Sequence, residues 1–104
     1  SSTVVIAEAA IDFLRRNARD SDEKPWFLYL PFQNIHEPYT CEKRFRDMYK
    51  SSGFSDGEQT IFGYISEMDE AVGRVVAQLR LSQVQYENTV IIFSSDNGAP
   101  PASP

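Results

Sequence analysis

The chain has 104 residues, with 10 Lys and Arg against 15 Asp and Glu, one His and one Cys, and 41% of its residues are hydrophobic. One domain at most fits this length, and the apolar fraction suffices for a core, which excludes intrinsic disorder. A net charge of −5 without a stripe of Lys or Arg argues against a nucleic acid partner, and no apolar run approaches the roughly 20 residues of a membrane span.

The N-terminal third predicts a helix followed by a buried strand. Apolar residues recur every three or four positions over residues 3–19, the spacing of an amphipathic helix. Pro25 cannot continue a helix, so a turn is predicted at residues 20–25. Residues 26–32 (WFLYLPF) form a continuous apolar run, which predicts a strand covered on both faces. A polar segment, residues 33–38 (QNIHEP), follows it.

The rest of the sequence predicts two more helices and a second strand. A short helix is predicted at residues 42–49 and a long one at residues 56–81, where Ser55 and Glu58 form an S-x-x-E capping box. The predicted buried face of the long helix consists of its branched and long apolar residues: Ile61, Ile65, Met68, Val72, Val75, Val76 and Leu79. Residues 89–93 (TVIIF) predict another strand buried on both faces, which ends in residues 94–98 (SSDNG). The tail, residues 99–104, holds three prolines and shows no periodicity.

Two buried strands joined through a long helix predict a right-handed β-α-β crossover, and hence an α/β fold with a parallel sheet. A sheet of only two such strands would leave its apolar faces and edges open to water. We therefore expect residues 1–104 to be an incomplete segment of a larger domain.

The candidate site residues follow the two predicted strands. Ligands bind at the carboxyl ends of parallel strands, and His36, Asp96 and Asn97 follow those ends. Asp96 and Asn97 offer the hard oxygen ligands that Ca²⁺ accepts, and His36 could donate a hydrogen bond or transfer a proton. The alternatives are a plain Asn-Gly turn at Asn97 and a loop histidine bonded to a backbone carbonyl at His36.

Other reactive side chains fit no known catalytic motif. Cys41 lies outside any redox or zinc motif, so an inert thiol is expected. Ser94 and Ser95 end the second strand without the G-x-S-x-G pattern, so a hydrolase nucleophile is not predicted there.

Three blocks of the chain resemble consecutive blocks of the type I sulfatases. They are residues 24–38 (KPWFLYLPFQNIHEP), 68–75 (MDEAVGRV) and 88–98 (NTVIIFSSDNG), in the same order and at similar separations. Within that family the chain most resembles the arylsulfatase B group, the N-acetylgalactosamine-4-sulfatases. The resemblance implies an alkaline-phosphatase-like α/β fold and a lysosomal or extracellular enzyme that hydrolyses the sulfate esters of a sulfated glycan or an aryl sulfate.

The resemblance also implies roles for particular residues. Asp96 and Asn97 match a pair that binds the active-site Ca²⁺, and His36 matches the H-x-P histidine, which contacts the substrate sulfate and takes part in catalysis. The family nucleophile is a formylglycine made from the cysteine of a C-x-P-S-R motif, and Cys41 is not in such a motif. The upstream Asp pair and a downstream Lys of the metal site are also absent from these residues.

We therefore expect a central segment of a calcium-dependent sulfatase, inactive as an isolated chain. Two alternatives remain at this point. One is a non-catalytic, truncated or degenerate relative with a structural or binding role. The other is a phosphatase or phosphonate hydrolase of the same superfamily, which the H-x-P spacing and the Asp-Asn pair disfavour.

Overall fold

The helices predicted from apolar periodicity are present in the structure. The computed structural model describes residues 1–19 and 24–99, and its helices are α1 (Ser2–Arg19), α2 (Lys43–Asp47), α3 (Asp56–Arg80) and α4 (Gln83–Glu87). Helix α4, capped by the side chain of Ser82, was not predicted. The predicted turn at residues 20–25 falls largely outside the described residues, as does the tail beyond Ala99.

The start of α3 is fixed by the predicted capping box. The Glu58 backbone N–H donates to Ser55 Oγ at 3.3 Å, and the Ser55 backbone N–H donates to Glu58 Oε2 at 2.8 Å. Each bond satisfies a backbone donor that a helix start or its flanking residue would otherwise leave open. These hydrogen bonds favour the charged carboxylate and lower the pKa of Glu58.

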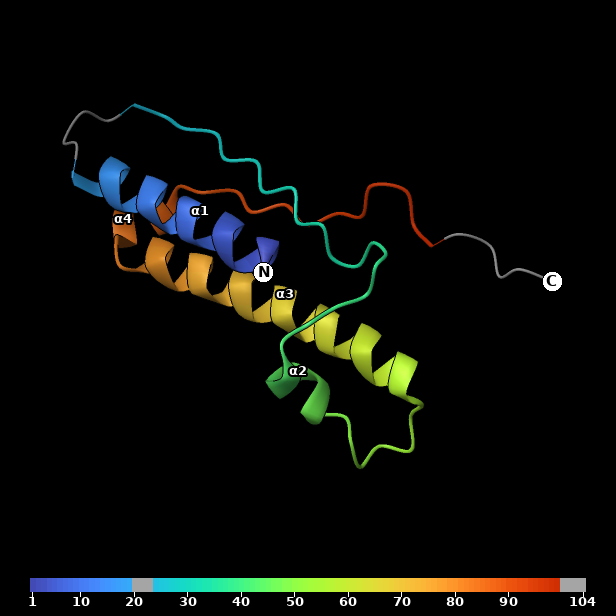
Figure 1. Ribbon diagram of the computed structural model, residues 1–104. Coiled ribbons are helices and arrows are strands. Elements are labelled where there is room, and N and C mark those ends of the chain that lie inside the picture. Colours follow the sequence, from blue (N-terminus) through green and yellow to red (C-terminus); the bar gives the residue numbers. More distant parts are fainter. Residues whose placement is uncertain (20–23, 100–104) are drawn as a thin grey trace.

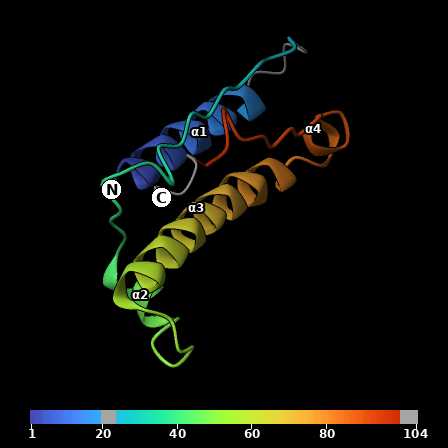
Figure 2. The same cartoon turned by 90° about the vertical axis from the view of Figure 1, so that its right-hand side faces the viewer.

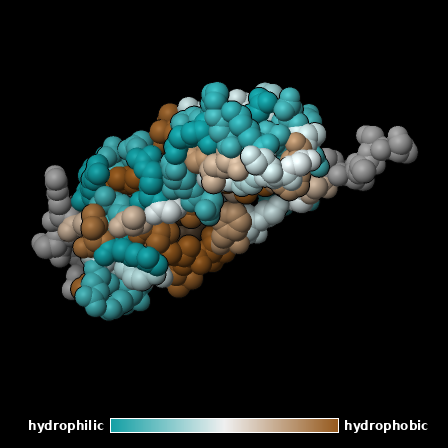
Figure 3. All heavy atoms as spheres, turned by 90° about the horizontal axis from the view of Figure 1, so that it is seen from below, coloured by the Kyte–Doolittle hydropathy of each residue, from teal (hydrophilic) through white to brown (hydrophobic). Residues whose placement is uncertain are grey.

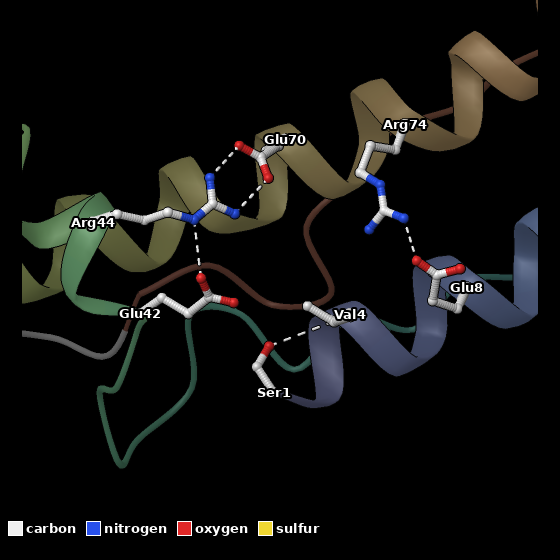
Figure 4. A network of polar contacts seen from close by, with 7 residues as sticks. All are labelled: Ser1, Val4, Glu8, Glu42, Arg44, Glu70 and Arg74. Atoms are coloured by element: carbon white, nitrogen blue, oxygen red, sulfur yellow. Dashed lines mark hydrogen bonds and ion pairs between the residues drawn. The ribbon is translucent and has the colours of Figure 1, made fainter.

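Helices α1 and α3 pack side by side and run in the same direction (Figures 1 and 2). The core between them is built mostly from small and medium apolar side chains: Ala7, Ala10, Ile11, Leu14, Ala71, Val75 and Leu79. Trp26 covers one side of this core, with its ring 5.9 Å from the ring of Phe13 in an edge-on contact. Arg74 of α3 and Glu8 of α1 form an ion pair across the outer edge of the contact (Figure 4).

The buried face of α3 is rotated from the predicted one. Its buried residues are Gln59, Gly63, Tyr64, Glu67, Ala71, Val75 and Leu79, so only Val75 and Leu79 of the predicted face are buried. Ile65 is exposed and Met68 and Val72 are half-buried. These three line a hollow of about 400 Å³ together with Asp69 and Phe93, and Figure 3 shows apolar atoms gathered along this side of the molecule. Helix α3 thus carries two apolar faces, and α1 covers the one with smaller side chains.

The predicted α/β fold is wrong for the part of the chain that the structure describes. Residues 1–19 and 24–99 contain helices and irregular segments but no strand, so the parallel sheet, the β-α-β crossover and the alkaline-phosphatase-like architecture are not observed. Residues 26–32 and 89–93, predicted as strands, are irregular segments in Figure 1. A strand exists only where its backbone groups pair with a neighbour, and no described residue forms a ladder with either segment.

The two segments also lack the double-sided burial predicted for them. In residues 26–32, alternate side chains pack against the core while Phe27, 88% exposed, points away from it. In residues 89–93 the apolar side chains are largely exposed, Val90 at 85%. A continuous apolar run therefore predicted burial correctly for one face of the first segment only.

Helix α2 and the loop before it pack closely on the first half of α3. A Cβ atom at Gly63 would lie 2.8 Å from Cys41 Sγ and 2.9 Å from the backbone nitrogen of Arg46. Only a residue without a side chain fits this contact. On the outer side, Arg44 donates two hydrogen bonds to Glu70, at 2.8 and 2.6 Å, and one to Glu42 at 2.9 Å (Figure 4).

Candidate functional site

His36 lies in an exposed turn that follows the first extended segment. The turn is closed by a hydrogen bond of 2.8 Å from the backbone N–H of His36 to the carbonyl oxygen of Gln33. The Nδ1 atom of the ring lies 2.7 Å from the carbonyl oxygen of Glu37. Because a carbonyl oxygen only accepts hydrogen bonds, Nδ1 carries the hydrogen in this contact. Nε2 is therefore the ring nitrogen that this contact leaves available to a ligand.

Asp96 and Asn97 lie in a second exposed turn, at residues 95–98. The backbone N–H of Asn97 donates to Asp96 Oδ1 at 2.8 Å, and the backbone N–H of Gly98 donates to Ser95 Oγ at 3.1 Å. Gly98 has a φ of +78°, a conformation that glycine adopts without strain. The turn leaves Asp96 Oδ2 and the side-chain oxygen of Asn97 as two further oxygens for a ligand.

The fold brings these two turns to the same end of the molecule. In both Figure 1 and Figure 2, the turn at residues 33–38 and the segment at residues 94–98 lie near the start of α1. The 59 residues between His36 and Asp96 form a loop, α2, α3, α4 and the extended segment that follows α4. That His36, Asp96 and Asn97 serve one site stays a prediction, and the sheet edge that motivated it is not observed.

The donor set fits Ca²⁺ only in part. Oxygen atoms of a carboxylate and an amide are its preferred ligands, but Ca²⁺ takes about six to eight of them. Among the described residues no group of three or more His, Cys, Asp or Glu side chains is arranged to hold a metal. Asp96 and Asn97 would therefore supply part of a coordination shell.

A hollow between α2 and α3 lies apart from these turns. It measures about 310 Å³ and is lined by Arg44, Phe45, Met48, Ser66, Asp69 and Glu70. Arg44 and Glu70 are paired with each other, and the hydrogen bonds between them lower the pKa of Glu70 and raise that of Arg44. Ser66 is hydrogen-bonded to Tyr49 at 2.7 Å. The hollow offers no unpaired cation to an anionic substrate.

Cys41 has the environment of an unreactive thiol. Its Sγ lies 3.6 Å from the carbonyl oxygen of Thr60, to which it donates. Burial, together with the negative charge of Glu67, raises the pKa of the thiol. The Glu67 side chain is only 3% exposed, and neither of its carboxylate oxygens finds a hydrogen-bond partner among the described residues.

We expect iodoacetamide to alkylate Cys41 more slowly than it alkylates free cysteine at about pH 8, because the raised pKa lowers the thiolate fraction. The rate should rise as the pH increases toward the raised pKa. Glu67→Gln removes the neighbouring charge and should speed the reaction, whereas Glu87→Gln, on exposed α4, should leave it unchanged. Mass spectrometry of the modified chain measures the rates, and alkylation as fast as free cysteine would contradict the expectation.

Sequence reasoning missed one residue that structures the His36 turn. The side chain of Asn34 joins the turn to α1 and to α3 through two hydrogen bonds. An asparagine in a polar turn gives no periodic or motif signal, so only the tertiary contacts identify it.

Comparison with known proteins defines the family. The sulfatase family profile matches residues 1–103, and the chain therefore belongs to the sulfatase family. N-acetylgalactosamine-6-sulfatase of Homo sapiens is 30% identical over 97 residues, which cover 93% of this chain and 16% of that protein. Arylsulfatase J of Mus musculus is 34% identical over 80 residues, covering 77% of the chain and 13% of that protein. Steryl-sulfatase of Rattus norvegicus is 34% identical over 94 residues, covering 90% of the chain and 14% of that protein.

These relatives also test the expected assignment to the arylsulfatase B group. The chain matches 16% or less of the length of each of the three proteins just named. They support the sulfatase family and do not support the expected assignment to the arylsulfatase B group. No solved structure matches the chain. No helix in the described ranges is both long enough and apolar enough to cross a membrane.

Proposed function

We propose that the chain is the central segment of a calcium-dependent sulfatase that hydrolyses sulfate esters of a sulfated sugar or an aryl sulfate. Membership in the sulfatase family supports the reaction class. The observation that carries the proposal is the placement of the His36 turn and the turn at residues 95–98 at one end of the molecule (Figures 1 and 2). An imidazole and a carboxylate-amide pair can there serve a common ligand.

His36 is proposed to bind an oxygen of the sulfate group. Its Nδ1–H is engaged by the carbonyl of Glu37, so Nε2 is the atom that meets the substrate. Neutral imidazole holds only one hydrogen, and Nε2 can donate only when the ring is protonated. The contact is therefore a charge-assisted hydrogen bond from an imidazolium, which is stronger than one between neutral groups.

Asp96 and Asn97 would hold Ca²⁺ with their free side-chain oxygens. When bound, the ion would supply positive charge that stabilises the sulfate oxygens in the transition state. The hydrogen bond from the Asn97 backbone to Asp96 Oδ1 fixes the orientation of the carboxylate. The remaining Ca²⁺ ligands would come from parts of the full-length protein outside these 104 residues.

The isolated chain is proposed to be inactive, since its 104 residues hold no C-x-P-S-R motif from which formylglycine is made. Cys41, followed by Glu42, Lys43 and Arg44, is a half-buried thiol outside such a motif. A location in the lysosome or outside the cell belongs to the same proposal and rests on the family resemblance.

Turnover of p-nitrophenyl sulfate tests the proposal. We expect the full-length protein that contains this chain to hydrolyse it, to lose activity with a calcium chelator and to recover it with added Ca²⁺. The 104-residue chain should show no turnover under the same conditions. p-Nitrophenyl phosphate, the matched substrate, should be a poor one.

Three results would contradict the proposal. Preference for the phosphate ester would indicate a phosphatase of the same superfamily. Binding of a sulfated glycan by a full-length protein without turnover would indicate a non-catalytic relative. Measurable turnover by the 104-residue chain alone would show that the nucleophile lies within these residues.

A further inference from the structure

Asn34 links the His36 turn to two helices. Its Oδ1 accepts a hydrogen bond of 2.6 Å from Thr3 Oγ1 in the first turn of α1. Its Nδ2 donates a hydrogen bond of 2.7 Å to the carbonyl oxygen of Tyr64 in α3. The two bonds span 31 and 30 positions of sequence, so one amide group ties together three distant parts of the chain.

The orientation of this amide follows from its partners. The Tyr64 carbonyl can only accept, so the nitrogen of Asn34 must face it, and the oxygen must face the Thr3 hydroxyl. Thr3 is 1% exposed and Asn34 is half-buried. Water therefore cannot readily replace Thr3 as the partner of Asn34, and the loss of either side chain leaves a shielded polar group without its bond.

Asn34 lies inside the turn that carries His36. The hydrogen bond from the His36 backbone to the Gln33 carbonyl encloses Asn34 and Ile35. The next contact, between the His36 ring and the Glu37 carbonyl, sets the direction of the ring relative to that turn. Because Asn34 fixes the turn on the helices, it also fixes the place from which the imidazole projects.

We infer that Asn34 is a positioning residue that holds His36 in place for the sulfate group, with Thr3 as its partner. This inference rests on the proposed function, since it assumes that His36 meets the substrate. Among the described residues, the exposed His36 ring makes one hydrogen bond, to the adjacent Glu37, so its position depends on the turn. Small displacements of a group that contacts the reacting centre lower rates strongly.

The test measures kcat and KM for p-nitrophenyl sulfate in the full-length protein. We expect Asn34→Ala to lower kcat/KM about tenfold, because a displaced His36 would lose roughly the value of one hydrogen bond to the transition state. Thr3→Val, which removes only the hydroxyl, should have the same effect to a smaller extent, and Thr3→Ser should restore activity. Asn17→Ala is the matched control, because Asn17 also donates to a helix carbonyl, that of Phe13 at 2.8 Å, but far from the turn.

A double variant separates positioning from general destabilisation. In a His36→Ala background, Asn34→Ala should lower kcat/KM by less than about twofold, since the group that it positions is gone. An equal loss in both backgrounds, or no loss from Asn34→Ala alone, would overturn the inference. If His36→Ala itself leaves kcat/KM unchanged, the proposed role of His36 fails first. Circular dichroism and thermal unfolding confirm that each variant is folded.

Discussion

Asp96→Ala in the full-length protein is expected to lower kcat/KM for a sulfate ester on the order of 10³-fold, since the stabilisation of several kcal/mol from a catalytic metal would be lost. The same variant should bind Ca²⁺ more weakly in isothermal titration calorimetry. The loss has a structural component as well, because Asp96 Oδ1 accepts the backbone hydrogen bond of Asn97.

Asp96→Asn separates the metal role from the turn role. An amide oxygen can still accept the hydrogen bond from Asn97, so the turn is kept, but the negative charge is lost. Weak Ca²⁺ binding and low activity in Asp96→Asn would support a metal ligand. Activity and Ca²⁺ response equal to those of the unaltered protein would assign Asp96 to the turn alone. Asp12→Asn, an identical change on the exposed side of α1, serves as the control.

His36→Ala is expected to lower kcat/KM about 10- to 100-fold, the range that corresponds to one hydrogen bond from a charged donor. His36→Gln, which keeps an N–H donor without the charge, should lose less. The variant should stay folded, because the His36 ring is exposed and its one local bond is to the adjacent residue.

The sequence predicted the helices well because their signals are local. The capping box of Ser55 and Glu58 and the apolar spacing over residues 3–19 and 56–81 each involve residues within a few positions of one another. The backbone hydrogen bonds of a helix lie within the helix itself, so a helix needs no partner backbone from a distant part of the chain. Helix α4 is only five residues long, which is too short for periodicity to be seen.

The strands could not be decided in the same way. Residues 26–32 and 89–93 have strand-like composition, but pairing depends on a partner backbone that composition does not specify. The face of α3 was also misjudged, because periodicity finds the most hydrophobic stripe and not the one that fits a neighbour. Around Gly63 and Ala71 the smaller side chains allow close approach, and that stripe is the buried one.

For the candidate site, the sequence by itself identified His36, Asp96 and Asn97 through residue type and position after apolar runs. Only the tertiary structure brought their two turns to one end of the molecule, showed that Nδ1 of His36 contacts the Glu37 carbonyl and revealed Asn34 as the link to α1 and α3. The physical reason is the distance in sequence over which each property is determined. Chemical identity and helix formation are encoded within a few residues, whereas the direction of a side chain depends on contacts that the fold makes across 30 or more positions.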